Sequence, residues 1–482
     1  MITLINPCLA VQKNDIFTTG IIYMPVGLAY LAAKLRALNE QLTVIDSFAE
    51  GVTSVRSENN QYIQGLNYDE IRRRIPKDSE LIIIYANNLI SHNTIMNTVK
   101  RIKDENSGSM VALMENSQAV SAYSLETIKD GFLNNGIDFL ITGDSEDAVP
   151  VLLDGMRKKN TGGSRIFRGF IDNLDELPFP AWDLFPLEKY WGLGYAHGPL
   201  ETKRYLPMLT SRGCPYKCNF CVSPKTTGGK WRGRSAENVV SEMKQFSGKF
   251  KLREFHIEDL NPTVSEDRII EISRRVIDDK LDIIWKLVSG TKAETIKNTD
   301  TVRLMGESGC NYVSISPESG SETLMNSMNK AFDKEHAVKL IKSMNTAGVY
   351  TQACFVLGFP GETKQDLLQT KELLFKLIKA GVDEIALFLI TPVPGSSIYN
   401  DFKGFSSLSE LTFSPAWRKD FQFLNNYRLK LYLLFILTKI LFHPFKSFMQ
   451  VIRIFAGTYR TKMEMTPARA FKFKLASLRA GV

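Results

Sequence analysis

Three cysteines stand within eight residues of one another, Cys214, Cys218 and Cys221, in the spacing Cys-x3-Cys-x2-Cys. They directly follow a strand candidate, so we expect them on a loop at the carboxyl end of that strand. Thiolates are the usual ligands of iron–sulfur clusters, and four of them saturate a 4Fe–4S cube. The chain's other three cysteines are far away in sequence. A cluster bound here would therefore keep one iron open to a substrate or cofactor.

Two other kinds of site use closely spaced cysteines. A structural zinc site wants a fourth Cys or His ligand, and His256 is the nearest plausible donor. A redox dithiol needs only two cysteines. The spacing favours the cluster, while a zinc-stapled binding protein for a nucleotide or an anionic surface stays the alternative from another class. Cys310 and Cys354 stand in apolar segments, which favours buried, inert thiols.

Composition restricts the class of protein. The 482 residues are enough for two or three domains. A net charge of +8 is modest and does not indicate nucleic-acid binding, so we expect no nucleic-acid partner. Six cysteines, half of them clustered, are not a disulfide framework and fit a reducing compartment. The N-terminal residues lack the pattern of a signal peptide, so the expected location is cytoplasmic.

Short apolar runs alternate with helical stretches through residues 1–160, which we expect to form one domain. The predicted strands are 2–6, 42–46, 81–85, 110–114 and 139–142. Runs that are apolar throughout are typical of strands buried on both faces, so the fold predicted is α/β, a Rossmann-like doubly wound parallel sheet. Ligands of such folds lie at the carboxyl ends of the strands. Residues 161–200, rich in proline and acids, are predicted to be an ordered linker.

In residues 201–400, short apolar runs again alternate with helical stretches. The predicted strands are 207–211, 254–258, 283–289, 312–316, 351–357 and 384–390. Helical stretches such as 265–279 and 334–347 lie between them. Six β/α units predict a partial (β/α)6 barrel, whose chemistry collects at the carboxyl ends of the strands.

Residues 401–482 have no strand rhythm and are predicted to form a helical C-terminal cap. Their longest uncharged apolar run, 431–438, is far shorter than the roughly 20 residues that span a bilayer. After Asp420 the chain has eleven Lys and Arg residues and one acid, Glu464. We favour a cap over the active site, with a buried apolar stripe and a solvated basic face. The alternative is peripheral contact with an anionic membrane surface, which would suit a lipid or pigment substrate.

The cysteine loop resembles the signature of the radical S-adenosylmethionine (SAM) superfamily, with an aromatic residue before the third cysteine. Later segments resemble, in order, the strand ends of that family's barrel: residues 256–259, 314–320, 358–363 and 392–399. The third of these reads Gly-Phe-Pro-Gly-Glu-Thr. The resemblance implies a cluster on the three cysteines and a group of residues near cluster and SAM: Phe220, Glu258, Asp259, Ser316, Glu318, Ser319 and Gly358.

The resemblance also implies the chemistry. The open iron would chelate SAM, and an electron from a donor such as flavodoxin or ferredoxin would cleave it. The resulting 5′-deoxyadenosyl radical would abstract hydrogen from an unactivated carbon. The protein would position the reactants and exclude water, while the cofactors carry the difficult chemistry. No residue is predicted to be catalytic in its own right.

Some of these side chains have structural interpretations as well. Asp259 could cap a helix that begins near Thr263, and Glu318 could be a turn residue. His256 is as consistent with packing as with function. Arg212 flanks the cysteines, where it could tune the charge of a cluster or be solvated.

The first domain resembles the cobalamin-binding domain found in some of these enzymes. The resemblance rests on a Pro-x-Gly helix start and on residues 44–46, 143–146 and 177–182. It implies cobalamin as a further cofactor, near a set of loop residues: Pro25, Gly27, Asn88, Ser91, Glu115 and Gly143.

One cobalamin-facing loop departs from the family. Residues 114–120, Met-Glu-Asn-Ser-Gln-Ala-Val, replace the usual Gly-Gly-x-His loop, whose glycines let the backbone approach closely. His92 is the only histidine before the linker, so we expect no axial histidine ligand from the protein. The alternative is a domain that keeps the fold and has lost cobalamin.

The resulting hypothesis is a cobalamin-dependent radical SAM methyltransferase that acts on an unactivated carbon or phosphorus of a small molecule or lipid. A radical cyclase, oxidase or rearrangement enzyme that uses cobalamin but transfers no methyl group is the alternative within the superfamily. A methylthiotransferase would want a second cysteine triad in the first domain, where only Cys8 stands. The sequence identifies no substrate.

Overall fold

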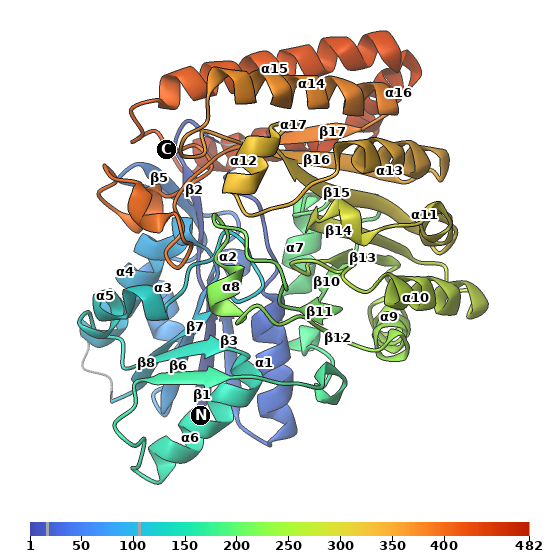
Figure 1. Cartoon of the computed structure of the whole chain (residues 1–482). Helices are drawn as coiled ribbons and strands as arrows, with labels where there is room; N and C mark the ends of the chain where they lie inside the picture. Colours follow the sequence, from blue (N-terminus) through green and yellow to red (C-terminus); the bar gives the residue numbers. More distant parts are fainter. Residues whose placement is uncertain (16–18, 105–107, 482) are drawn as a thin grey trace.

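The computed structural model describes residues 1–15, 19–104 and 108–481 and begins with a six-stranded parallel sheet (Figure 1). The strand order is β3-β1-β6-β7-β8-β9. The bounds are β1 Ile2–Asn6, β3 Leu42–Asp46, β6 Leu81–Ala86, β7 Met110–Glu115, β8 Phe139–Gly143 and β9 Ile166–Gly169. Parallel pairing confirms the predicted fold class. Strand β9 was not predicted, because it is short and lies in the range assigned to the linker.

Helices cover both faces of this sheet. Along β6, Leu81 and Ile83 pack into the same core as α1 and α6, while Ile82 and Ile84 pack into a second core with α3 and α4. Such two-sided burial explains the continuous apolar run that predicted the strand. The helices are α1 Val26–Ala37, α2 Ser47–Glu50, α3 Tyr68–Arg74, α4 His92–Asp104, α5 Lys129–Leu133 and α6 Ser145–Arg157. A small antiparallel sheet of β2 Leu9–Gln12, β5 Gln61–Gln64 and β4 Val55–Glu58 was not predicted.

The segment after β9 runs across the first domain and packs against it. The Ala181 N–H donates to the carbonyl oxygen of Ala29 in α1 at 2.9 Å, and the neighbouring Trp182 is fully buried. Helix α7, Leu187–Leu193, follows and ends at Gly194 with a φ of 65°. Burial of these residues makes the segment an ordered connection, with little freedom between the two domains.

A second six-stranded parallel sheet forms the open barrel (Figure 1). Its strand order follows the sequence: β10 Tyr205–Met208, β13 Glu254–Ile257, β14 Ile284–Thr291, β15 Cys310–Glu318, β16 Tyr350–Leu357 and β17 Glu384–Leu389. The larger helices between them are α9 Ala236–Phe250, α10 Glu266–Asp278, α11 Thr299–Glu307, α13 Lys334–Thr346 and α14 Lys364–Ala380. Strands β10 and β17 are the two edges, so the predicted partial barrel is confirmed.

Three helices follow the barrel: α15 Phe421–Phe442, α16 Pro444–Ala456 and α17 Lys462–Arg479. Helix α17 starts against the barrel, where the Met463 N–H donates to the Glu384 carboxylate at 2.6 Å. Within the described residues, no single helix is long and apolar enough to cross a membrane. Helices α15 and α16 pass that test only as a pair, bent by 115°.

The helical nature of this tail is confirmed. Its expected buried apolar stripe is present in α15, as Leu424, Leu431 and Phe435. Most of the basic residues of α15 and α16, however, do not form a solvated face. Lys439 is 3% exposed, and Lys446 and Arg453 make ion pairs with Asp383 and Glu464. Several large apolar side chains of α15 and α16 are instead exposed. The pattern could not reveal this, because apolar and basic residues recur on the same segments and periodicity alone does not say which face turns inward.

Candidate functional site

The three cysteines lie on the loop between the short strand β11, Ser211–Arg212, and helix α8, Ser223–Thr226. All three thiols are free and half-buried. Burial raises the pKa of each thiol, that of Cys221 to about 12. A bound cation of high charge is the kind of partner that would deprotonate them.

The donor set fits an iron–sulfur cluster by its chemistry, since thiolates are the ligands such clusters take. Among the described residues, no three or more His, Cys, Asp or Glu side chains already stand in an arrangement that could hold a metal ion. His256, on which a zinc site would have depended, is buried, stacks on Tyr205 at 4.8 Å and lies 3.0 Å from the Glu254 carboxylate. The packed interpretation of His256 is therefore the one the structure supports.

Asp259 fastens the start of the cysteine loop to the barrel. Its carboxylate accepts from the Thr210 N–H at 2.7 Å and from the Thr210 and Ser211 hydroxyls at 2.6 Å. It is fully buried, and burial raises its pKa. Helix α10 is capped by Ser265 instead, so Asp259 is not a helix cap. Its role in the structure is to position the loop.

Arg212 joins the same loop to the first domain. Its guanidinium donates to Asp144 at 2.9 Å and to both oxygens of Glu146 at 2.8 and 2.9 Å. Arg232 reaches the other oxygen of Asp144 at 2.5 Å. These four side chains are all nearly inaccessible to solvent. The Gly-Asp-Ser-Glu segment after β8 is therefore an inter-domain clamp, which motif reasoning on one domain at a time could not show.

Glu318 and Lys330 form a buried ion pair near the cysteines, with 2.5 Å between carboxylate and ammonium. Glu318 has a φ of 60°, unusual for a residue with a side chain. Lys330 also donates to the Ser316 carbonyl oxygen at 2.8 Å. Although burial works against its charge, Glu318 and Cys218 raise the pKa of Lys330. Sequence reasoning missed Lys330, which stands after a short helix and carries no signal of its own.

Phe220 and Glu258 lie on either side of this region. Phe220 packs partly buried against a small apolar core that includes Met328 and Phe359. Glu258 lies 2.6 Å from His197 of the linker. Burial opposes ionisation of Glu258, but His197 outweighs it and lowers the pKa of this carboxyl. His197 in turn lies 3.3 Å from Lys462 of α17, so linker, barrel and tail meet here.

Three of the predicted cobalamin-domain residues line one pocket, namely Gly27, Glu115 and Gly143, together with Gln118 and Arg212. Burial raises the pKa of Glu115 to about 7, and its carboxylate accepts from the Leu125 N–H at 2.9 Å. The pocket holds about 30 Å³. That is room for roughly one water molecule inside this pocket.

Bulky side chains narrow this pocket. The Tyr85 hydroxyl lies 2.9 Å from the point where a side chain on Gly27 would begin, and Met114 is the next neighbour. Met114 and Glu115 end strand β7, just before the loop that departs from the resembling family. Pro25 precedes the first residue of α1 and its carbonyl oxygen accepts from the Ala29 N–H.

The remaining predicted residues have local partners. Asn88 accepts from the Ser91 N–H and hydroxyl, each at 3.1 Å, and neither lines the pocket at Gly27. Ser319 is fully buried and shares a hydrogen bond with Thr370 at 2.9 Å. Local hydrogen bonds therefore hold these three side chains.

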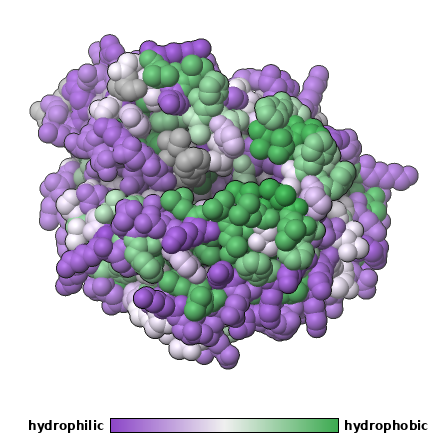
Figure 2. All heavy atoms as spheres, turned by 90° about the horizontal axis from the view of Figure 1, so that it is seen from above, coloured by the Kyte–Doolittle hydropathy of each residue, from purple (hydrophilic) through white to green (hydrophobic). Residues whose placement is uncertain are grey.

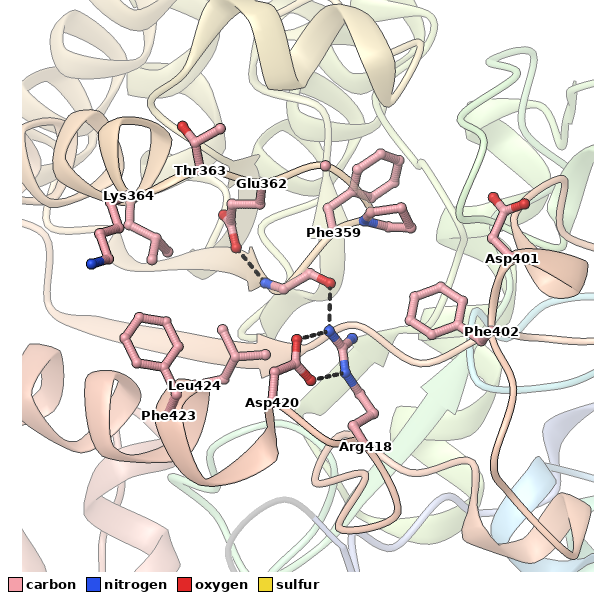
Figure 3. A pocket seen from close by; sticks show the side chains of 14 residues that line it. Phe359, Glu362, Thr363, Lys364, Asp401, Phe402, Arg418, Asp420, Phe423 and Leu424 are labelled. Atoms are coloured by element: carbon pink, nitrogen blue, oxygen red, sulfur yellow. Dashed lines mark hydrogen bonds and ion pairs between the residues drawn. The ribbon is translucent and has the colours of Figure 1, made fainter.

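Gly358 lines a separate pocket of about 410 Å³ at the carboxyl end of β16 (Figure 3). Its N–H donates to Glu362 and its carbonyl oxygen accepts from Arg418 at 2.9 Å. Asp420 pairs with the same guanidinium at 2.6 Å. The second carboxylate oxygen of Glu362 is buried without a hydrogen-bond partner, and burial raises the pKa of this group to about 7.

Replacing Glu362 by glutamine should flatten the pH dependence of stability. The folded carboxyl keeps its proton up to about pH 7, whereas the unfolded one ionises near 4.5. The wild-type free energy of unfolding should therefore fall as pH rises between these values, by on the order of 1–2 kcal/mol. Urea unfolding at pH 5 and pH 8 measures the difference. An equal pH dependence in Glu362→Gln and wild type would contradict the assignment.

Residues 208–374 match the Radical SAM superfamily. The chain is 26% identical over 434 residues to an uncharacterized methyltransferase of Pyrococcus horikoshii, covering 87% of this chain and 85% of that protein. It is 24% identical to a cytidylyl-2-hydroxyethylphosphonate methyltransferase of Streptomyces wedmorensis, covering 83% and 81%.

A solved structure shares the fold of both domains. It is the cobalamin-dependent SAM radical enzyme OxsB with aqua-cobalamin bound, with a TM-score of 0.59 and 16% sequence identity. The match covers 87% of this chain but only 56% of that chain. The cysteine loop falls inside the matched family segment, at the carboxyl side of the first barrel strand. Residues 208–374 therefore form a Radical SAM domain and the chain is a radical SAM enzyme, with SAM and a 4Fe–4S cluster as the cofactors of that family.

Proposed function

We propose that the chain is a cobalamin-dependent radical SAM methyltransferase, with its 4Fe–4S cluster on Cys214, Cys218 and Cys221. Its substrate would offer an unactivated carbon or phosphorus on a small molecule or lipid. The observation that carries the proposal is the three-thiol loop at the end of a barrel strand, inside the segment matched by the family. Three protein thiolates leave one iron of a cube for SAM.

The surrounding side chains then have distinct tasks. Asp259 and Arg212 hold the root of the loop to the barrel and to the first domain. Lys330, paired with Glu318, places a buried positive charge near the thiols, where it offsets the negative charge of thiolates. Phe220 closes the loop against apolar side chains. When bound, cluster and SAM supply the radical, and these residues position them and exclude water.

Cobalamin in the first domain is supported by the fold and the relatives. OxsB, which shares the two-domain fold, binds cobalamin, and the relatives that cover most of this chain are named methyltransferases. Tyr85 and Met114 narrow the pocket at the sheet edge. A cobalamin-dependent radical cyclase, oxidase or rearrangement enzyme that transfers no methyl group is the second candidate.

The partners follow from the same proposal. An electron donor such as flavodoxin or ferredoxin would reduce the cluster. A cytoplasmic location suits free thiols, because they persist in reducing compartments. A peripheral contact of the C-terminal helices with a membrane belongs to the proposal as well, and it would suit a lipid substrate.

The deciding experiment uses the full chain, reconstituted with iron and sulfide under anaerobic conditions and incubated with SAM, a strong reductant and hydroxocobalamin. We expect bound iron, 5′-deoxyadenosine and S-adenosylhomocysteine, with cobalt retained after gel filtration. 5′-Deoxyadenosine and retained cobalt without S-adenosylhomocysteine would select the second candidate. Protein that binds zinc, takes up no iron and forms no 5′-deoxyadenosine would refute both.

A further inference from the structure

Helices α15 and α16 present a broad apolar surface to the outside of the molecule. Figure 2, which looks down on the side where α15 lies in Figure 1, shows an extended hydrophobic area. The C-terminal apolar face consists of Leu429, Leu433, Ile436, Leu437, Ile440, Leu441, Phe442, Phe445, Phe448, Val451, Ile452 and Phe455. Leu441 is 75% exposed and Phe455 is 86% exposed. A continuous surface of this size is unusual on a soluble monomer.

Apart from Lys430, the basic residues of these two helices are turned toward the protein. Lys439 donates to the carbonyl oxygen of Asp383 at the start of β17, and Lys446 donates to the Asp383 carboxylate at 2.9 Å. Arg453 pairs with Glu464 at 2.8 Å. Burial lowers the pKa of Lys439 to about 8, because keeping this ammonium group charged inside the protein costs free energy. The helices are therefore held to the barrel by polar bonds and, in α15, by buried Leu424, Leu431 and Phe435, while the twelve side chains of the C-terminal apolar face lie outward.

A helix that covers a core in water keeps its apolar residues on the inward stripe and a polar face outside, whereas α15 and α16 carry a large apolar face on the outside. Such a face indicates an apolar medium outside the protein. The 115° bend between α15 and α16, and the bonds that fix α15 along β17, place the helices against the barrel wall. Such a pair fits the interface of a bilayer, with apolar side chains in the acyl region, as interfacial helices do.

The charged residues near the C-terminal apolar face indicate which class of lipid it would contact. Residues 421–463 contain no Asp or Glu and seven Lys or Arg. Of the described residues of α15 and α16, Lys430 is the one exposed charged side chain. Lys379 of α14 is exposed as well and lies over the Phe442 ring at 5.3 Å. Exposed cations beside an apolar face, without acids among them, are complementary to anionic headgroups.

We propose that the C-terminal apolar face docks the enzyme on the surface of an anionic phospholipid bilayer, with Lys430 and Lys379 at the headgroups. The inference names the surface and the lipid class for the membrane contact above. It does not depend on the radical chemistry. A second copy of the chain fits less well, because protein interfaces surround an apolar core with a polar rim, and this face has few polar groups with which to form one.

The test is flotation of the full-length reconstituted enzyme with vesicles of phosphatidylcholine alone and with an equal mixture of phosphatidylcholine and phosphatidylglycerol. We expect clear binding to the mixed vesicles and at least about tenfold weaker binding to the neutral ones. Phe448→Ser/Phe455→Ser should weaken binding to the mixed vesicles at least about tenfold, since each substitution removes a large apolar side chain from the lipid. Lys379→Gln/Lys430→Gln should weaken binding to the mixed vesicles only.

Met110→Ser/Val151→Ser is the matched control, because both side chains are exposed apolar residues of the first domain. It should bind as wild type does. Thermal unfolding and 5′-deoxyadenosine formation, unchanged in every variant, would show that folding and chemistry are intact. Wild-type protein that stays unbound with both vesicles would overturn the proposal. So would a dimer in light scattering that the Phe448→Ser/Phe455→Ser pair dissociates while vesicle binding is absent.

Discussion

Replacing Cys218 by serine should abolish SAM cleavage. The loop supplies three thiols, and the loss of one leaves two, too few to hold a cube with a single open iron. Members of a catalytic unit typically cost about 10⁴- to 10⁶-fold when removed singly, so we expect 5′-deoxyadenosine formation to fall by at least about 10³-fold. Iron content and the visible spectrum of the reconstituted protein should fall with it.

The matched control is Cys8→Ser, which alters a cysteine of the first domain. The Cys8 thiol is buried and donates to the Leu66 carbonyl oxygen at 3.1 Å, a bond that a serine hydroxyl can also make. This variant should keep its iron and nearly all of its activity. Wild-type iron and 5′-deoxyadenosine in Cys218→Ser would show that the cluster is held elsewhere and would remove the basis of the proposed function.

Strand positions in both parallel sheets could be predicted well because burial on both faces leaves an unbroken apolar run. Residues 81–85 and 351–357 are clear cases, and the structure places β6 and β16 there. Strands β2, β4 and β5 escaped prediction because each has four residues and mixed polarity. In a segment of that length, neither the two-residue period of a strand nor the 3.6-residue period of a helix can be distinguished from a loop.

Candidate site residues could be named from the sequence where residue types and spacing are local, but not where they come together through long-range contacts. The three cysteines are neighbours in sequence and lie on one loop. Lys330 beside Glu318, and His197 beside Glu258, are brought together by the barrel and the linker, so no spacing rule pointed to them. The altered loop at Glu115 was visible in the sequence, but the narrowing of the pocket by Tyr85 was not.

Replacing Arg212 by methionine should destabilise the protein strongly. The variant leaves Asp144 and Glu146 buried at the domain boundary, with Arg232 as the remaining cation beside Asp144. Breaking a buried charge pair costs about 3–5 kcal/mol, because the partner stays desolvated without compensation. We therefore expect a fall of about that size in the free energy of unfolding at pH 7, measured by urea titration.

The pH dependence of the free energy of unfolding gives a second, independent test of the ion pairs that Asp144 makes. Burial opposes ionisation of Asp144, but Arg212 and Arg232 lower its pKa below the usual value of 3.8. In the wild type this group adds stability above pH 3.8, and the gain is lost as pH falls through the folded pKa. Without Arg212 the carboxyl binds a proton more readily, so the gap between variant and wild type should narrow as pH is lowered toward 4.

Two further variants separate the buried clamp from a general effect of losing an arginine. Arg36→Met removes an exposed pair with Asp183, 2.7 Å long, and should cost less than about 1 kcal/mol. Adding Asp144→Asn and Glu146→Gln to Arg212→Met removes the stranded charges and should recover most of the lost stability. If Arg212→Met proved no more costly than Arg36→Met, the clamp would not hold the cysteine loop to the first domain. The loop would then owe its position to Asp259 and the barrel alone.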